Sequence, residues 1–172
     1  MVRNIITYPI QFVFLVLLQA VVLNNVQFSS FINPYIYILF LLWLPLETPK
    51  ALLLFLGFLL GLSVDIFSNT LGMHTSASIF LAFCRPFVLQ FIAPRDGYEL
   101  NQQPGIKDFG WSWFFIYAAT LTFLHHLFLF YIEVFRFSDF FNTLGRVFAS
   151  WFFSLIIIFI AQLFRYNAEE RR

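Results

Sequence analysis

Four ionisable side chains interrupt long apolar stretches of the sequence: Asp65, Arg85, His125 and His126. Asp65 is the clearest case, because the fourteen residues before it carry no charge. An ionised carboxylate costs roughly 2.5 to 3.5 kcal/mol at the centre of a membrane helix, so such a residue marks either a functional site or a paired structural group. The chemistry open to this set is ion pairing, proton transfer or metal binding.

Arg85 is the candidate partner of Asp65. At 1.5 Å per residue, Arg85 lies roughly 9 Å deeper in the membrane than Asp65, and a long arginine side chain covers most of that distance. Pro86 follows directly, and a proline removes one helical hydrogen bond and frees a carbonyl that could also accept from Arg85. We expect an ion pair that fixes two adjacent helices; the alternative is a binding or switching site.

The adjacent histidines His125 and His126 lie at about the same depth as Asp65. Neighbouring helical residues point about 100° apart, so the pair lacks the i, i+4 spacing of a zinc-binding helix. One of the two could face Asp65 and titrate. We expect hydrogen-bonded structural histidines, with a proton relay or a metal ligand as the alternative.

Sequence motifs of catalysis do not accompany these residues. The sequence has neither a glycine-rich phosphate loop nor a paired His/Glu metal signature. The single cysteine, Cys84, allows no internal disulfide. The ten basic residues are scattered, which argues against nucleic-acid binding. We therefore expect a non-enzymatic protein without a cofactor and without a nucleic-acid partner.

The elements that position these residues are membrane helices. The 172-residue chain is 60% hydrophobic and 11% charged, whereas a soluble domain carries about 25% charged residues. A helix needs about 20 apolar residues to cross the hydrocarbon core. Six segments approach this length: 5–23, 33–46, 51–68, 73–92, 111–131 and 147–164. The sequence thus predicts an all-α, polytopic membrane protein with six transmembrane helices in one domain, residues 1–172.

Basic residues set the predicted orientation. Seven of them, from Arg3 to Arg172, lie on one set of ends and connections, whereas the other set holds Arg136 and Arg146. Because cytoplasmic loops are rich in Lys and Arg, we expect both termini in the cytoplasm. The first segment lacks a small-x-small cleavage site, so it is expected to be a retained span and not a signal peptide. Residues 93–110 form a polar cytoplasmic loop, either a tether between helices or a docking site for a cytoplasmic partner.

Small residues predict close helix packing. Gly57, Gly61 and Asp65 are each four residues apart and share one helix face, which lets another backbone approach closely. We expect this face to pack inside the bundle, and the alternative is a homodimer interface. Ser150 and Ser154 repeat the spacing in the last span and are candidates for a protein contact face. Residues 135–147 mix aromatics with single charges, which predicts a segment along the outer interface.

Residues 47–89, ETPKALLLFLGFLLGLSVDIFSNTLGMHTSASIFLAFCRPFVL, resemble the most recognisable part of the bacterial rod-shape-determining protein MreD. The family pattern is a glycine, an aspartate and then a glycine that begins the next span. Here these are Gly61, Asp65 and Gly72, and Arg85-Pro86 fits the span that follows. PRDGYE and FLHHLFLFYIEVFRF further along also look like one branch of that family. The likeness covers nearly the whole chain in length, number of spans and their order.

The resemblance implies a non-enzymatic inner-membrane component of the cell-elongation (rod) complex. Family members bind MreC and act with MreB, RodA and its partner transpeptidase to guide peptidoglycan synthesis and cell shape. The implied fold is a six-helix bundle like that of the substrate-binding subunits of ECF transporters. That kinship supplies the alternative function, binding or transport of a vitamin-like small molecule. Those subunits usually carry an Ala-x-x-x-Ala face in their first span, whereas the first span here has one alanine, Ala20.

Overall fold

The computed structural model describes residues 2–25, 32–99, 102–134 and 140–170. Over these ranges the chain is helical and forms no β-strand, which confirms the all-α class. The elements are α1 (Val2–Leu17), the π-helix η1 (Leu18–Leu23), α2 (Leu39–Trp43), α3 (Lys50–Ser68), α4 (Met73–Phe91), α5 (Ile106–Val134) and α6 (Phe140–Glu170). Within the described ranges, three helices are long and apolar enough to cross a membrane: α3, α5 and residues Phe140–Asn167 of α6.

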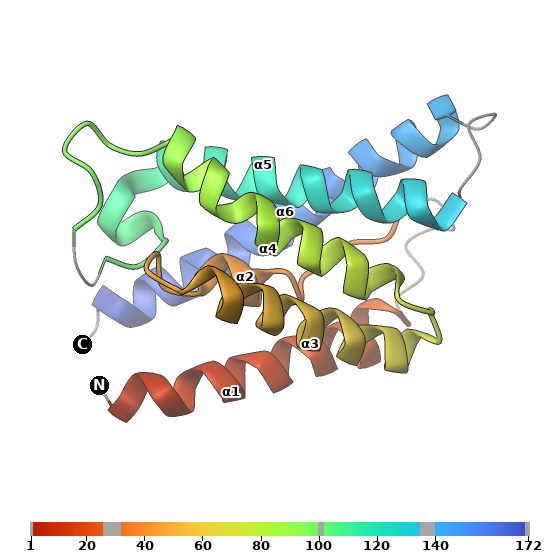
Figure 1. Cartoon of the computed structure of the whole chain (residues 1–172), viewed down its shortest axis with the longest axis horizontal. Helices are drawn as coiled ribbons and strands as arrows, with labels where there is room; N and C mark the ends of the chain where they lie inside the picture. The colour runs from red at the N-terminus through yellow and green to blue at the C-terminus, as the bar shows by residue number, and fades with distance from the viewer. Residues whose placement is uncertain (1, 26–31, 100–101, 135–139, 171–172) are drawn as a thin grey trace.

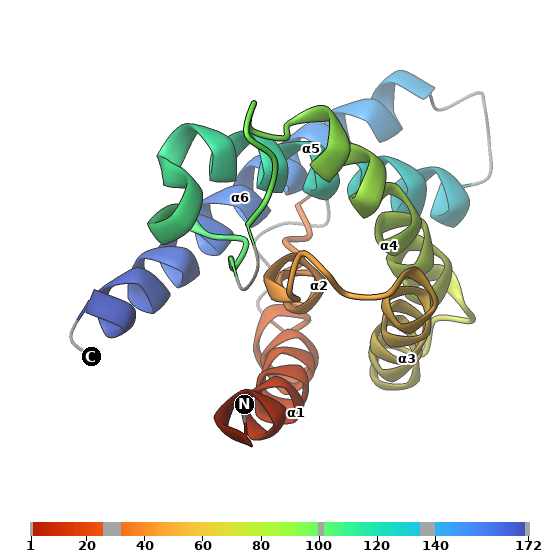
Figure 2. The same cartoon turned by 60° about the vertical axis from the view of Figure 1, so that its left-hand side comes forward.

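The long helices form a bundle around a short one. Helices α3, α4, α5 and α6 pack against one another in chain order, and α1 runs along the outside of α2 and α3 (Figure 1). Figure 2 shows α2 in the middle of the bundle, between α1, α3 and α6. Both chain ends lie at one end of the bundle, and the turn between α3 and α4 lies at the other (Figure 1).

The prediction of a helix over residues 33–46 is wrong. Residues 33–38, which we call the irregular segment, are non-helical, and α2 after them has five residues. The segment contains Pro34, which lacks an N–H and disfavours helix in the residue before it. Irregular backbone at membrane depth is tolerated where protein surrounds it and satisfies its polar groups. This condition holds here, because every residue from Pro34 to Leu42 is buried.

The other helix boundaries differ from expectation mainly in the second half of the chain. α5 begins at Ile106 and is interrupted at Gly110, whose φ of 79° and ψ of 175° are non-helical, so its continuous part begins at 111 as expected. α6 begins at Phe140, well before the expected 147. The described part of the expected interfacial segment therefore belongs to α6. The rest of that segment lies outside the described residues, as do three arginines used for orientation: Arg136, Arg171 and Arg172.

The loop between α4 and α5 is fastened to the end of α4. The Tyr98 hydroxyl donates to the Leu89 carbonyl at 2.7 Å, and the Trp113 indole N–H donates to the Ile92 carbonyl at 3.1 Å. Partial burial raises the pKa of the Tyr98 phenol above its usual value, which keeps it a hydrogen-bond donor at neutral pH. These contacts fit a tether between helices.

Candidate functional site

Asp65 lies in the last turn of α3 and binds the start of α4. Its Oδ1 accepts the backbone N–H of His74 at 3.0 Å and the hydroxyl of Thr70 at 2.6 Å. Its Oδ2 accepts the backbone N–H of Thr75 at 2.9 Å and the Thr75 hydroxyl at 2.5 Å. The first N–H groups of a helix lack partners within the helix, and the helix dipole favours an anion there. Asp65, 4% exposed, thus caps α4 from the preceding helix.

The glycines of the same hairpin let its two helices touch. A Cβ atom on Gly61 would lie 2.6 Å from the Thr75 nitrogen, and one on Gly57 would lie 3.0 Å from the Ser78 carbonyl oxygen, so α3 and α4 are in backbone contact at these positions. Gly72 precedes α4 with a φ of 78°, a conformation that glycine adopts at little cost. The glycine face therefore packs inside the bundle, against α4.

The prediction of an ion pair between Asp65 and Arg85 is wrong. The structure shows an ion pair between Arg146 and Glu133, at 3.2 Å, and none between Asp65 and Arg85. The donors of the α3–α4 hairpin already occupy both carboxylate oxygens of Asp65. The carbonyl that Pro86 was expected to free for Arg85 is not its partner either, because Arg85 reaches another segment of the chain.

Arg85 holds the C-terminal end of α2. Its Nη2 donates to the Leu44 carbonyl in a short hydrogen bond, and its Nη1 donates to the Pro45 carbonyl at 3.3 Å. Its Nε donates to the Tyr117 hydroxyl at 2.7 Å, and that hydroxyl donates onward to the Leu42 carbonyl at 3.1 Å. The last carbonyls of a helix lack partners within the helix. Arg85, which is 1% exposed, therefore supplies charged donors where α2 ends inside the bundle.

His126 belongs to a chain of hydrogen bonds that supports the irregular segment. The backbone N–H of Tyr35 donates to the Ser154 Oγ at 2.8 Å, and Ser154 lies 2.9 Å from His126 Nε2. His126 Nδ1 lies 2.8 Å from the Thr122 carbonyl, which can only accept, so Nδ1 carries the proton. In the neutral histidine, Nε2 then accepts from Ser154. With a neutral His126, each of these hydrogen bonds has one donor and one acceptor.

His125 points to a different neighbour. Its Nε2 lies 2.7 Å from the Tyr37 hydroxyl, which also lies 3.2 Å from Nδ1 of His74. His74 is the residue whose backbone N–H binds Asp65, so one polar chain joins the α3–α4 hairpin to the centre of α5. The ring Nδ1 of His125 is buried without a partner among the described residues. Both predicted histidines are hydrogen-bonded inside the bundle, and neither bonds to Asp65.

Side chains of other helices satisfy the backbone of the irregular segment. The N–H groups of residues 33, 35 and 36 donate to Ser150 at 3.0 Å, Ser154 at 2.8 Å and Gln19 at 2.9 Å. An extended chain rises about 3.3 Å per residue, so N–H groups two residues apart match serines four residues apart on a helix. Ser150 and Ser154 thus form an internal contact, not the expected face for another protein.

One polar cavity of about 590 Å³ lies at the end of the bundle opposite the termini. Its wall comes from η1, the irregular segment, the α3–α4 turn and the end of α5. Gln19 and His74 are buried in it, whereas Asn24 and Glu133 are exposed at its rim. A second space of about 620 Å³, between α1 and α3, is an almost wholly apolar groove.

The structure divides the predicted residues between three places. The α3–α4 hairpin contains Gly57, Gly61, Asp65 and Gly72, the end of α2 contacts Arg85, and the centre of the bundle holds His125 and His126. Sequence reasoning missed Gln19, Tyr37, His74 and Tyr117, which connect these places. Gln19 had a usable signal, since it is an uncharged polar residue inside the first apolar run; the tyrosines had none, because tyrosine is common in membrane spans.

The chain matches no protein-family model, no curated protein and no solved structure. Among the described residues, no three His, Cys, Asp or Glu side chains gather closely enough to hold a metal ion. Many of the buried polar side chains bond to backbone donors and acceptors.

Proposed function

We propose that the chain is a non-enzymatic inner-membrane scaffold of the bacterial cell-elongation complex, similar to MreD, that binds MreC and takes part in the control of cell shape and peptidoglycan synthesis. The resemblance of residues 47–89 is the reason for naming this complex. One observation supports a scaffold in particular: the buried charges of that stretch, Asp65 and Arg85, bind backbone groups of their own chain. They do not surround a space in which a substrate could react.

In this proposal the chain crosses the membrane as a bundle of six inserted segments, similar to the substrate-binding subunits of ECF transporters, with both termini in the cytoplasm. The three long apolar helices support it. So do large apolar side chains on the outer surface, since a soluble protein rarely exposes wide apolar patches. The phenylalanines that are more than half exposed include Phe55, Phe83, Phe87, Phe115 and Phe152. MreB, RodA and the elongation transpeptidase would be members of the complex, and lipid would cover the apolar surface.

The test is a pull-down of the tagged protein from its own membranes in a mild detergent, with mass spectrometry of the recovered proteins. We expect MreC together with RodA and its transpeptidase. An Asp65→Ala variant should recover less MreC per folded molecule, because the hairpin that carries the family pattern loses its cap. Arg95→Ala is the matched control, since Arg95 is an exposed charge on the loop after α4.

Two results would contradict parts of this proposal. Wild-type protein that recovers the other membrane proteins of its cell but no MreC would remove the family assignment. Wild-type abundance and wild-type MreC recovery in Asp65→Ala would leave the scaffold possible but remove the hairpin from it.

Binding or transport of a small, vitamin-like molecule is the second candidate function, and the polar cavity is the observation that favours it. Ligand sites of this size are common in proteins, at about 300 to 1,000 Å³. This function predicts that the same pull-down recovers an energy-coupling transport module or a stoichiometric metabolite. Recovery of MreC without either would decide against it.

A further inference from the structure

The polar cavity has a buried floor and an open rim. Gln19 is 1% exposed and His74 is 6% exposed, and both line the buried part of the cavity. Asn24, Asn25 and Glu133 are exposed around its mouth. Its first wall is η1, a π-helical turn, and such turns are rare and are found frequently at functional sites.

Most polar groups of the wall are occupied by the protein itself. The Gln19 side chain bonds to Asn24, to the Pro34 carbonyl and to the Ile36 N–H, and the Asn25 amide donates to the end of its own helix. These groups hold the cavity open in a defined shape. They are consequently not the groups that would recognise a ligand.

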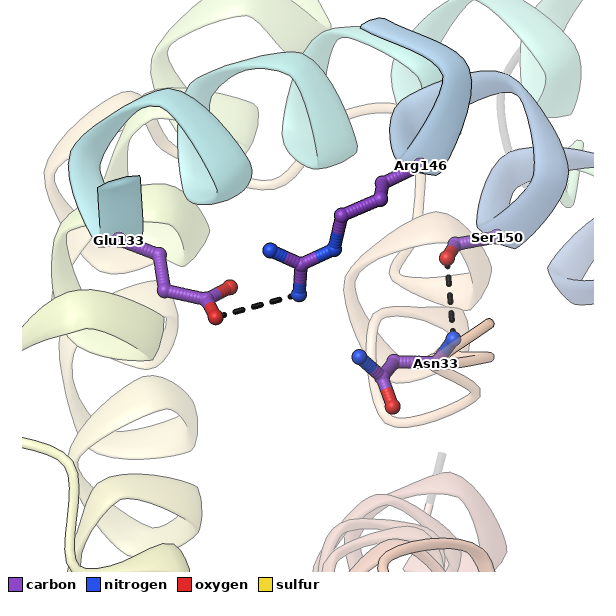
Figure 3. Close-up of polar contacts among 4 residues, drawn as sticks. All are labelled: Asn33, Glu133, Arg146 and Ser150. Atoms are coloured by element: carbon purple, nitrogen blue, oxygen red, sulfur yellow. Dashed lines mark hydrogen bonds and ion pairs between the residues drawn. The ribbon is translucent and has the colours of Figure 1, made fainter. Parts of the chain in front are cut away.

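His74, Asn33 and Glu133 each keep a polar atom without a partner in the described part of the wall. His74 binds Tyr37 through Nδ1, and its Nε2 has no partner among the described residues. The Asn33 backbone binds Ser150, but its side-chain amide has no partner within the described part of the chain and points away from that serine (Figure 3). Glu133 binds one nitrogen of Arg146 through Oε1, which leaves Oε2 available (Figure 3).

The charges of the wall decide which ligands fit. Glu133 is the one charged residue among those that line the cavity, and no lysine or arginine lines it in the described structure. Arg146 is close to Glu133, but its guanidinium is paired with that carboxylate and lies 4.8 Å from the centre of the Phe130 ring. Among the described residues that line the cavity, an anion would meet this carboxylate and no cation. Apolar ligand atoms would find the Tyr35 ring, Met73 and Leu129.

We propose that this cavity is a binding site for a small, uncharged or cationic organic molecule that has a ring or short apolar part and a hydrogen-bonding end. The hydrogen-bonding end lies between Glu133, Asn33 and His74, and the apolar part packs on Tyr35 and Met73. The site is formed by this chain alone, so it does not depend on MreC. It deepens the second candidate function by naming the class of ligand, and transport need not follow from binding.

The test uses three probes of one shape and different charge: 2-phenylethylamine, 2-phenylethanol and phenylacetate. Binding to the purified, detergent-solubilised full chain is measured by calorimetry at neutral pH. We expect saturable binding of the amine and the alcohol, and binding at least about tenfold weaker for phenylacetate. Glu133→Gln should weaken binding of the amine by about fivefold and leave binding of the alcohol within twofold of wild type. The reason is that an exposed ion pair contributes up to about 1 kcal/mol.

A matched pair of variants separates the cavity from the detergent micelle. Ala20 lines the cavity, whereas Val21 beside it is 62% exposed and does not. Ala20→Phe should abolish binding of both probes, and Val21→Phe should preserve it. Met73→Phe fills the cavity from α4 if Ala20→Phe does not fold. The proposal is overturned if none of the probes binds saturably, if phenylacetate binds as well as the amine, or if the filling variants behave like Val21→Phe.

Discussion

The two buried charges of the bundle solve opposite problems of the backbone. Asp65 accepts hydrogen bonds from the N–H groups of residues 74 and 75, where α4 begins. Arg85 donates hydrogen bonds to the carbonyls of residues 44 and 45, where α2 ends. Helix ends leave such groups unpaired, and hydrocarbon offers no water to satisfy them. Each charge has the sign that its helix end requires.

The two sites differ in how far along the chain they reach. The partners of Asp65 lie within ten residues of it, in one hairpin. The carbonyl partners of Arg85 lie about forty residues away, and its hydroxyl partner Tyr117 lies on α5. The Asp65 site can therefore form when α3 meets α4, whereas the Arg85 site needs α2, α4 and α5 together. A buried charge can thus stabilise either a local hairpin or the whole bundle.

Arg85→Ala should have the largest effect and lower the free energy of unfolding by about 3 to 5 kcal/mol. The substitution leaves two carbonyls and a hydroxyl without their donor, and each such loss costs about 1 to 3 kcal/mol. Denaturant unfolding of the solubilised protein measures it. Arg85→Lys should lie between this variant and wild type, since lysine keeps the charge but lacks the fork of donors. Wild-type stability in Arg85→Ala would show that the end of α2 does not depend on it.

Asp65→Ala should cost about 2 to 4 kcal/mol in the same measurement, since four hydrogen bonds to a carboxylate disappear. Asp65→Asn keeps the shape and one acceptor oxygen, so we expect about half of that loss. Hydrogen exchange should rise first at the start of α4. If exchange rose equally over α2, the Asp65 site would not be local.

Gly61→Ala should cost about 1 to 3 kcal/mol, because the new methyl group would overlap the backbone of α4 near Thr75. Gly57→Ala is the matched variant and should cost less, since its nearest contacts are at 3.0 and 3.1 Å. Thermal unfolding ranks the two. The reverse order would mean that the hairpin is not closest at Gly61.

Ser154→Ala should cost about 1 to 2 kcal/mol, because the buried N–H of Tyr35 loses its acceptor. Ser150→Ala should cost less, because the Asn33 N–H that it leaves is only half-buried. Both are measured by denaturant unfolding. Equal effects would mean that the irregular segment is held as firmly at its rim as at its centre.

The smallest expected effect is the coupling free energy between Asp65 and Arg85. In a double-mutant cycle of Asp65→Ala and Arg85→Ala, the losses should add to within about 0.5 kcal/mol, because the residues share no hydrogen-bond partner. A coupling well above 1 kcal/mol would restore the ion pair that the sequence suggested.

Much of the helical fold could be predicted from the sequence alone. α3 and α4 begin and end within one residue of the expected bounds, because long apolar runs and the turn around Gly72 define both helices. Residues 33–46 could not be predicted in the same way. Their apolar composition looks like that of a short span, and the groups that allow them to be irregular, Gln19, Ser150 and Ser154, are distant in sequence.

The sequence by itself determined that Asp65 and Arg85 are buried and that each needs a partner, since hydropathy and the rise of a helix give the depth of a residue. Only the tertiary structure decided which partner each one has. A helical repeat specifies how far along its axis a side chain lies, but the neighbours at that depth depend on which helices are adjacent and where one of them ends. Those choices are made by contacts between residues far apart in the chain.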